Sequence, residues 1–231
     1  MPSALITGAN RGIGLEFARQ YAEAGWQVHA CSRHIDAPAF NRLADKHIGN
    51  IHLHELDVSD HSQIDQLAKK VGGTPIDVLI NNAGIYPGGN KENFGTIDYE
   101  EWVEAFRINT MAPLKMVEAF VDNVAKSSEK KIVNITSKMG SIDDNTSGGY
   151  YLYRSSKAAL NMVVKSLSID LAPRGITTVV LHPGWVQTDM GGFNAPTPPA
   201  ESVAGIRRVI AGLRQKDSGK FYDFNGQEIL W

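Results

Sequence analysis

A tyrosine and a lysine four residues apart are the residues best suited to chemistry in this sequence. Tyr153 and Lys157 precede an apolar pattern typical of one buried helix face, and positions i and i+4 share a face of a helix. A phenol ordinarily titrates near ~10, and a neighbouring ammonium group favours the phenolate and lowers its pKa. The pair therefore predicts a proton-transfer site, although a Tyr-x-x-x-Lys spacing alone also arises by chance.

A glycine-rich turn near the start of the sequence predicts a binding site for a dinucleotide. The apolar run Ser3–Thr7 precedes this turn, and an amphipathic pattern over residues 15–22 follows it and closes near Gly25. Glycines permit a tight bend and let backbone N–H groups and a helix N-terminus approach a pyrophosphate. Because both a strand and a helix flank the turn, cofactor binding is favoured over an ordinary loop. The candidate cofactor residues in the turn are Gly8, Asn10, Arg11, Gly12, Ile13 and Gly14.

The end of the second predicted strand, Gln27–Ser32, bears on the choice of cofactor. An NAD site usually has an acidic residue there, bonded to the ribose 2′-hydroxyl. This sequence has Ser32 and Arg33 instead, with Arg11 in the glycine turn, and two cations suit a 2′-phosphate. NADP(H) is therefore favoured over NAD(H). Asp36, expected inside the next helix, keeps NAD(H) open, and Arg33 as a solvated surface charge is the other alternative.

Apolar runs predict alternating strands and helices along the rest of the chain. Strands are expected at residues 51–56, 76–80, 131–136 and 176–181, with a last strand or hairpin within 221–231; helices are expected at 62–71, 100–125, after Tyr153 and around 202–213. This alternation indicates a single α/β domain, with a doubly wound, Rossmann-like, mostly parallel sheet of seven strands and helices on both faces. About residues 1–95 would bind the cofactor, and about 96–231 would supply the catalytic and substrate residues.

Composition excludes several classes of protein. The 231 residues suit one domain with a sizeable core, and a net charge of -2 without a long basic run gives no support for binding nucleic acid or an anionic membrane. No stretch reaches the ~20 apolar residues of a membrane span. The single cysteine, Cys31, excludes an internal disulfide and is expected to be an inert strand residue of a cytoplasmic protein. His52, His54 and nearby His61 lack a second cluster of ligands, so no metal site is expected.

Together, the motifs resemble those of the short-chain dehydrogenase/reductase family over essentially the whole chain. In chain order they are Thr7-Gly8-x-x-x-Gly12-x-Gly14, Asn81-Asn82-Ala83-Gly84, Ser137, Tyr153-x-x-x-Lys157 and Pro183-Gly184. The interval between Ser137 and Tyr153 is slightly longer than the family's commonest spacing. The segments at residues 153–161 and 182–190 look more specifically like the C-factor/Sniffer-type carbonyl reductases.

The resemblance implies a role for each matching residue. Tyr153 would donate a proton to a carbonyl oxygen, Lys157 would lower the pKa of the tyrosine and bind the nicotinamide ribose, and Ser137 would hold the oxygen. Asn109, inside the long predicted helix, would bind a water that links Lys157 to solvent as a proton relay. The other cofactor residues implied are Asp57, Val58, Asn82, Ala83, Gly84, Pro183, Gly184, Val186 and Thr188, with Thr188 at the carboxamide.

The favoured function is an NADP-dependent carbonyl reductase that acts on a small or medium aldehyde or ketone, with Tyr153 as general acid and base. One alternative is an NAD-dependent alcohol dehydrogenase, which Ser32 and Arg33 disfavour. Another is a C-factor-like dinucleotide-binding protein that signals or senses redox state, which the intact catalytic set disfavours. The helices around Asn109 and after Tyr153 are expected to pair in a homodimer or homotetramer, as the family often does.

Overall fold

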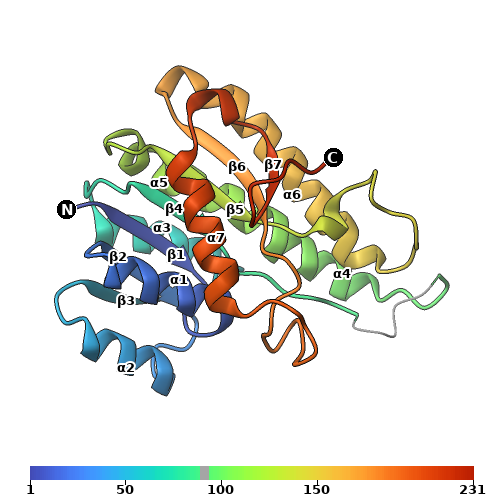
Figure 1. The fold of residues 1–231 in the computed structure, drawn as a ribbon, viewed down its shortest axis with the longest axis horizontal. Coiled ribbons are helices and arrows are strands. Elements are labelled where there is room, and N and C mark those ends of the chain that lie inside the picture. Colours follow the sequence, from blue (N-terminus) through green and yellow to red (C-terminus); the bar gives the residue numbers. More distant parts are fainter. Residues whose placement is uncertain (89–93) are drawn as a thin grey trace.

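A computed structural model describes residues 1–88 and 94–231 of the chain (Figure 1). Within these residues, seven strands form one sheet in the order β3-β2-β1-β4-β5-β6-β7, and every neighbouring pair is parallel. The strands are β1 (Ser3–Thr7), β2 (Gln27–Ser32), β3 (Ile51–Glu55), β4 (Val78–Asn81), β5 (Lys131–Ile135), β6 (Thr177–His182) and β7 (Phe221–Asp223). The predicted doubly wound, Rossmann-like α/β fold is confirmed.

Helices cover both faces of the sheet (Figure 1). One face carries α1 (Gly12–Glu23), α2 (Pro38–Lys46) and α7 (Pro199–Gly212). The other carries α3 (His61–Val71), α5 (Ala112–Ala125) and α6 (Tyr151–Asp170), with α4 (Tyr99–Phe106) against α6. No helix in the described part of the chain combines the length and apolarity that crossing a membrane requires.

The central strand β1 explains how the two faces share one core. Ala4 and Ile6 belong to the hydrophobic cluster under α1, α2 and α7, whereas Leu5 belongs to the cluster under α3 and α5. Side chains of a strand alternate between its faces, so a strand covered on both sides must be apolar throughout. All five residues of β1 are buried, and the same holds for β4 and β5.

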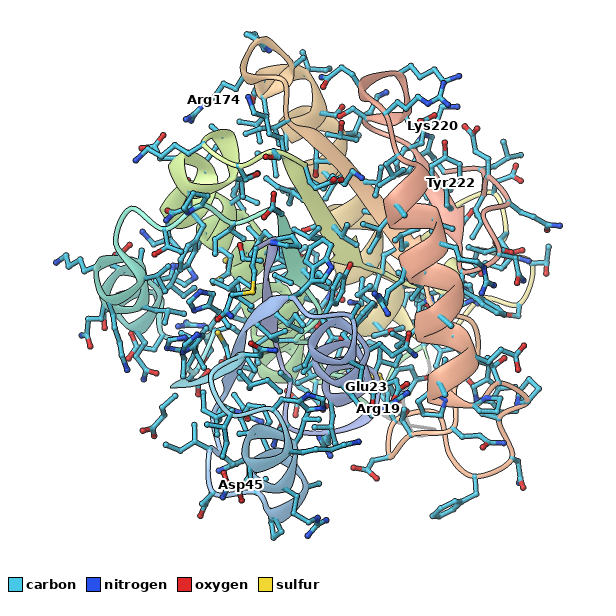
Figure 2. The ribbon with its side chains drawn as sticks, turned by 60° about the vertical axis from the view of Figure 1, so that its left-hand side comes forward. Arg19, Glu23, Asp45, Arg174, Lys220 and Tyr222 are labelled. Carbon is cyan, nitrogen blue, oxygen red and sulfur yellow. The ribbon has the colours of Figure 1, made fainter. Side chains whose placement is uncertain are left out.

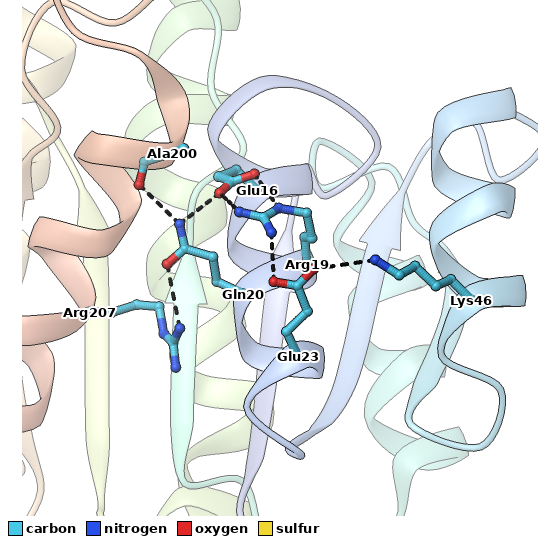
Figure 3. Close-up of polar contacts among 7 residues, drawn as sticks. All are labelled: Glu16, Arg19, Gln20, Glu23, Lys46, Ala200 and Arg207. Atoms are coloured by element: carbon cyan, nitrogen blue, oxygen red, sulfur yellow. Dashed lines mark hydrogen bonds and ion pairs between the residues drawn. The ribbon is translucent and has the colours of Figure 1, made fainter.

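Polar contacts fix how α1 lies against its neighbours (Figure 3). Arg19 Nη1 lies 2.6 Å from Glu23 Oε2, and Lys46 Nζ of α2 lies 3.6 Å from Glu23 Oε1. On the other side, Gln20 Nε2 donates to the Ala200 carbonyl oxygen of α7 at 3.0 Å. Figure 2 labels Arg19 and Glu23 on the outer side of the molecule, so these charges lie at the surface of α1, whereas Phe17, Ala18 and Tyr21 of the same helix are buried.

Several element boundaries differ from the sequence prediction. Asp60 caps α3 as expected, because its Oδ1 accepts a hydrogen bond from Ser62 N at 3.0 Å. The strand predicted at 76–80 runs instead from Val78 to Asn81, and Asp77 just before it accepts a hydrogen bond from Ser3 N at 2.8 Å. Asp36 was expected inside a helix but lies in a turn, because α2 begins at Pro38, a residue well suited to a first helical position.

The long helix predicted over residues 100–125 contains a π-helical turn. This turn (η2, Arg107–Met111) joins α4 to α5 without a break in the helical path. It contains Asn109 and Thr110, whose side chains bond to neighbouring elements; Thr110 Oγ1 donates to the Ser156 carbonyl oxygen of α6 at 2.8 Å. π turns often mark functional positions, because the extra residue re-aims a side chain.

The last segment is both a strand and a hairpin. β7 pairs in parallel with β6, and an antiparallel bridge then joins Tyr222 to Glu228. Between them, Asp223 Oδ1 accepts hydrogen bonds from the backbone N–H groups of Asn225 (2.8 Å) and Gln227 (2.9 Å). The predicted Asn225-Gly226 turn is therefore confirmed, with Gly226 at φ 89°.

Candidate active site

A cleft of about 990 Å³ opens beyond the carboxyl ends of the central strands. The chain winds from β1 toward β3 on one side and from β4 toward β7 on the other, so the strand order reverses between β1 and β4. In open parallel sheets, ligands bind at such a switch point, outside the carboxyl ends of the strands. The cleft therefore lies where this topology places a ligand site.

The cleft contains the candidate cofactor residues predicted from the sequence, apart from two. It is lined by Gly8, Asn10, Arg11, Gly12, Ile13, Gly14, Ser32, Arg33, Asp57, Val58, Asn82, Ala83, Gly84, Tyr153, Lys157, Pro183 and Thr188. The two others lie beside it. Gly184 lines a neighbouring cavity, and Val186 is buried and bridges to Thr197.

The glycine turn is held in shape by the Asn82 segment after β4. Gly8 has φ 67°, and a Cβ there would lie 3.0 Å from Ala83 Cα; a Cβ on Gly14 would lie 2.1 Å from the Gly8 carbonyl oxygen. Asn82 Nδ2 donates to the carbonyl oxygens of Thr7 (2.9 Å) and Gly8 (3.2 Å). Only glycine fits this close approach of two backbone segments. The Asn82 side chain thus fixes the turn that the sequence linked to a pyrophosphate.

The N-terminus of α1 opens into the cleft with features that suit an anion. Arg11 is the N-cap residue of α1, and its side chain makes no capping hydrogen bond. The first turn of α1, which the structure describes completely, contains no acidic residue. The first N–H groups of a helix lack intrahelical partners and carry partial positive charge. A phosphate group would satisfy them without competition from a carboxylate cap.

Cations gather at the end of the cleft next to β2. Arg33 is exposed there, as expected, and α2 adds Arg42 and Lys46, which the sequence interpretation missed. Their i, i+4 spacing on one helix was the available signal. Arg11 instead forms an ion pair with Asp189 across the cleft, with Arg11 Nη1 2.7 Å from Asp189 Oδ2.

Tyr153 and Lys157 both lie on α6, and both are buried, with 8% and 5% of their surface exposed. Lys157 Nζ donates to the Ile135 carbonyl oxygen at 3.0 Å and lies 5.8 Å from the centre of the Tyr153 ring. Burial lowers the pKa of Lys157 to about 8, because desolvation disfavours the ammonium form.

The pKa of Tyr153 moves in the direction opposite to the one expected. Burial raises the pKa of Tyr153 to about 12, and the hydrogen bond with Ser137 offsets only part of this. The expected lowering by Lys157 is not seen, because the ammonium group is bonded to Ile135 O rather than to the phenol. The phenol is therefore held in its protonated form, which is the form that can donate a proton.

Ser137 reaches Tyr153 because a short turn lies against α6. Ser137 caps the 3-10 turn that follows β5 and accepts a hydrogen bond from Met139 N at 3.2 Å. A Cβ on Gly140 would lie 2.9 Å from Lys157 Cβ, so glycine permits this contact. Asn161 Nδ2 donates to the Gly140 carbonyl oxygen at 3.1 Å and ties the turn to the helix.

Asn109 serves as a clamp on the loop after β4. Its Oδ1 accepts from Ile85 N at 2.9 Å, and its Nδ2 donates to Ile85 O at 3.0 Å and to Ser156 Oγ at 3.0 Å. A Cβ on Gly84 would lie 3.1 Å from Asn109 Oδ1 and 3.5 Å from Lys157 Nζ, so both side chains flank this glycine. Asn109 thus lies beside Lys157, as the resemblance implied, and also fixes the backbone of Ile85.

Outside the cleft, three histidines stack on the outer strands of the sheet. His29 of β2 lies 5.2 Å, centre to centre, from both His52 and His54 of β3, and a hydrogen bond joins His29 Nδ1 to His54 Nε2 at 3.0 Å. Burial, with a smaller effect of the neighbouring rings, lowers the pKa of His29 and of His54 to about 4. Among residues 1–88 and 94–231, no three or more His, Cys, Asp or Glu side chains are arranged to hold a metal ion.

Comparison with known proteins identifies the family. A family model described as short chain dehydrogenase matches residues 2–198. The chain belongs to the short-chain dehydrogenase/reductase family. Members of this family are oxidoreductases, and the chain is most like the Sniffer and C-factor types.

Two solved structures and one curated relative illustrate this likeness. The carbonyl reductase Sniffer of D. melanogaster is 36% identical with a TM-score of 0.92, and the comparison covers 100% of both chains. An NADPH-bound carbonyl reductase from chicken fatty liver is 36% identical with a TM-score of 0.91, covering 100% of this chain and 99% of that one. C-signal of Myxococcus xanthus is 48% identical over 157 residues, which is 68% of this chain and 93% of the relative.

Proposed function

We propose that this short-chain dehydrogenase/reductase is an NADP(H)-dependent carbonyl reductase in which Tyr153 is the general acid. The observation that carries the proposal is the contact of Tyr153 with Ser137 in a buried site at the wall of the cleft. Reduction of an aldehyde or ketone builds negative charge on oxygen, and two converging hydroxyl groups suit that charge. A phenol with a raised pKa is protonated at neutral pH and ready to donate.

The residues of the cleft fit NADP(H). The glycine turn and the N-terminus of α1 would hold the pyrophosphate, since both present backbone N–H groups and leave no room for side chains. Arg33, with Arg42 and Lys46 of α2, would bind the 2′-phosphate. Structures similar to this chain include an NADPH-bound carbonyl reductase, which supports the same choice. The bound nicotinamide would supply the hydride.

The other candidate residues complete the mechanism. Ser137 would hold the carbonyl oxygen while Tyr153 donates its proton. Lys157, whose ammonium group lies 5.8 Å from the centre of the Tyr153 ring in the same buried part of the site, would bind the nicotinamide ribose. Asn109 flanks Gly84 together with Lys157 and would help to pass the replacement proton from solvent.

A second candidate function is signalling, and one comparison favours it. The relative named C-signal is 48% identical to this chain over 157 residues, and its name indicates a signalling protein. A signalling role would need the bound dinucleotide but not the proton donor. An NAD-dependent alcohol dehydrogenase is less favoured. At the end of the cleft next to β2, the residue that lines the cleft is Arg33, whereas the acidic Asp36 lies in a turn and does not line it.

The first experiment is a side-by-side titration of the protein with NADPH and NADH, followed by nicotinamide fluorescence. Tighter binding of NADPH, together with loss of that preference in Arg33→Ser, supports the 2′-phosphate site. Equal binding of both cofactors would contradict it. NADPH-dependent turnover of a panel of aldehydes and ketones then tests carbonyl reduction.

The Tyr153→Phe variant separates catalysis from binding. We expect turnover to fall by roughly 10²–10⁴-fold, the usual contribution of a general acid, while the dissociation constant of NADPH changes little. If a biological effect of the protein survives in Tyr153→Phe, the signalling function gains. Unchanged turnover would show that another group donates the proton.

We also propose how the molecule is organised beyond the site. About residues 1–95 would bind the cofactor and about 96–231 would supply the catalytic and substrate residues. A homodimer or homotetramer would form through α4 and α6, whose outer faces expose Val103 and Met162. A cytoplasmic location fits the one cysteine, Cys31, which is a buried free thiol.

A further inference from the structure

The loop after β4 brings a second tyrosine against Tyr153. The Tyr86 ring lies 4.6 Å from the Tyr153 ring, centre to centre, with 58° between their planes. Such tilted pairs are favourable because the edge of one ring faces the electron-rich face of the other. Tyr86 is only half-buried, so part of its ring is open to a ligand beside the proposed proton donor.

The position of Tyr86 is fixed by the clamp on its neighbour. Ile85 N and Ile85 O both bond to the Asn109 side chain, at 2.9 and 3.0 Å. Two hydrogen bonds to one residue define the direction in which the chain leaves it. The π turn that places Asn109 therefore also places the Tyr86 ring, at the cost of an irregular helix.

A third tyrosine extends this surface. The Tyr150 ring lies 6.3 Å from the Tyr86 ring at 46°. Tyr150 has a left-handed backbone, with φ 52° and ψ 40°, directly after Gly148 and Gly149, which also have positive φ. A left-handed residue other than glycine costs of the order of 1 kcal/mol, and such strain gathers at functional sites. Tyr150 is also half-buried, so it extends the partly open surface of Tyr86, which itself contacts Tyr153.

We propose that Tyr86 and Tyr150 form an aromatic wall of the substrate site that selects flat, aromatic carbonyl compounds over puckered aliphatic ones. This proposal names a class of substrate for the proposed carbonyl reduction and rests on that function. A planar ring can lie against aromatic side chains over its whole face, whereas a saturated ring of similar size touches them at fewer points. The wall thus acts on substrate choice and leaves the proton donor unchanged.

Benzaldehyde and cyclohexanecarbaldehyde test the wall, because they match in size and differ in planarity. Benzaldehyde is intrinsically less reactive, so the measured quantity is the change in the ratio of their kcat/KM values between wild type and Tyr86→Leu. We expect this ratio to fall by roughly 2- to 10-fold, mostly through KM, as an aromatic pair is worth this much. Tyr99→Leu, at an exposed tyrosine of α4, is the matched control and should leave the ratio unchanged.

Binding to the protein loaded with NADP⁺ provides a readout that needs no turnover. Calorimetric titration with each aldehyde should give a lower Kd for benzaldehyde in wild type and similar values in Tyr86→Leu. If the wild type turns over neither aldehyde, the proposed reduction of such aldehydes is wrong. The ratio of the two Kd values still tests whether Tyr86 and Tyr150 favour the planar compound. Equal Kd values in wild type, or an equal loss for both aldehydes in the variant, would overturn it. Should Tyr86→Leu fail to fold, Tyr150→Leu carries the same test.

Discussion

At the scale of single residues, burial acts on Tyr153 and Lys157 in opposite directions. It raises the pKa of the phenol to about 12 and lowers the pKa of the ammonium group to about 8, because each neutral form is favoured away from water. At neutral pH the phenol is protonated and the lysine is still mostly charged. This combination suits proton donation to a carbonyl better than proton removal from an alcohol.

The pH dependence of carbonyl reduction should follow Lys157. Its pKa of about 8 is lowered by burial, so the charged form is present below this pH and is lost as pH rises through it. We therefore expect kcat/KM with NADPH to be constant near neutral pH and to fall above about pH 8 with the loss of one proton. Initial rates across pH check this, and Lys157→Met should give a low, flat profile. Rates that rise through this range would contradict the assignment.

At the scale of elements, the π turn interrupts the regular α-helix between α4 and α5 and connects two segments that are distant in the sequence. Asn109 in this turn links the loop after β4 to α6 through Ile85 and Ser156. Asn109 itself is fully buried, its bond to Ser156 is buried and its two bonds to Ile85 are partly buried, so a group left without a partner there is costly. The connection stabilises the fold and the site together.

Replacing Asn109 by Ala should destabilise the protein by roughly 2–4 kcal/mol, since the N–H and carbonyl groups of Ile85 both lose their partner. Urea unfolding followed by circular dichroism measures this change. Asn145→Ala, at an exposed position in the loop before α6, is the control and should have little effect. A change below about 0.5 kcal/mol at Asn109 would show that water replaces the clamp.

The stacked histidines should make the outer strands sensitive to acid. The pKa of His54 is lowered to about 4, mainly by burial, while an unfolded histidine titrates near ~6.5. The unfolded state therefore binds more protons, so this contribution is full above pH ~6.5 and is lost as pH falls toward about 4. We expect a loss of about 1–2 kcal/mol between pH 7.5 and pH 5, measured by urea unfolding. His54→Phe should reduce that loss; an unchanged slope would argue against the cluster.

At the scale of the whole molecule, the exposed apolar side chains of α4 and α6 stand out. Val103 on α4 is 56% exposed, and Met162 and Ile169, one heptad apart on α6, are each 66% exposed. Trp102 Nε1 donates to Ser155 Oγ at 2.8 Å and joins the two helices. Exposed apolar side chains on two helices that contact each other support the proposed pairing of subunits through α4 and α6.

Charging this face should separate the subunits. We expect the Val103→Glu, Met162→Glu double variant to elute as a monomer while wild type elutes as a dimer or tetramer, measured by light scattering after size exclusion. Ile142→Glu, on an exposed loop before α6, should not change the mass. A wild type that is already monomeric would contradict the proposed pairing.

Much of this architecture could be predicted from the sequence, because local patterns carry it. The strand and helix alternation, the glycine turn and the Tyr153-x-x-x-Lys157 spacing all depend on neighbouring residues. Arg42 was missed although its spacing from Lys46 on one helix was visible in the sequence. The contact of Tyr86 with Tyr153 and the pairing of Arg11 with Asp189 were not predicted, since they arise only when distant segments meet. The direction of the Tyr153 pKa was wrong for the same reason: burial is a property of the folded chain.

The π turn also sets the rotational phase of α4 relative to α5. An α-helix advances about 100° per residue, so one residue removed from Arg107–Met111 would turn α4 about its own axis by roughly that angle. Trp102 would turn away from Ser155, and the exposed side chain of Val103 would turn with it. The same added residue that aims Asn109 at Ile85 therefore keeps the outer surface of the molecule in register. A change of length in this segment would therefore act on the proposed substrate site and on the proposed subunit contact together.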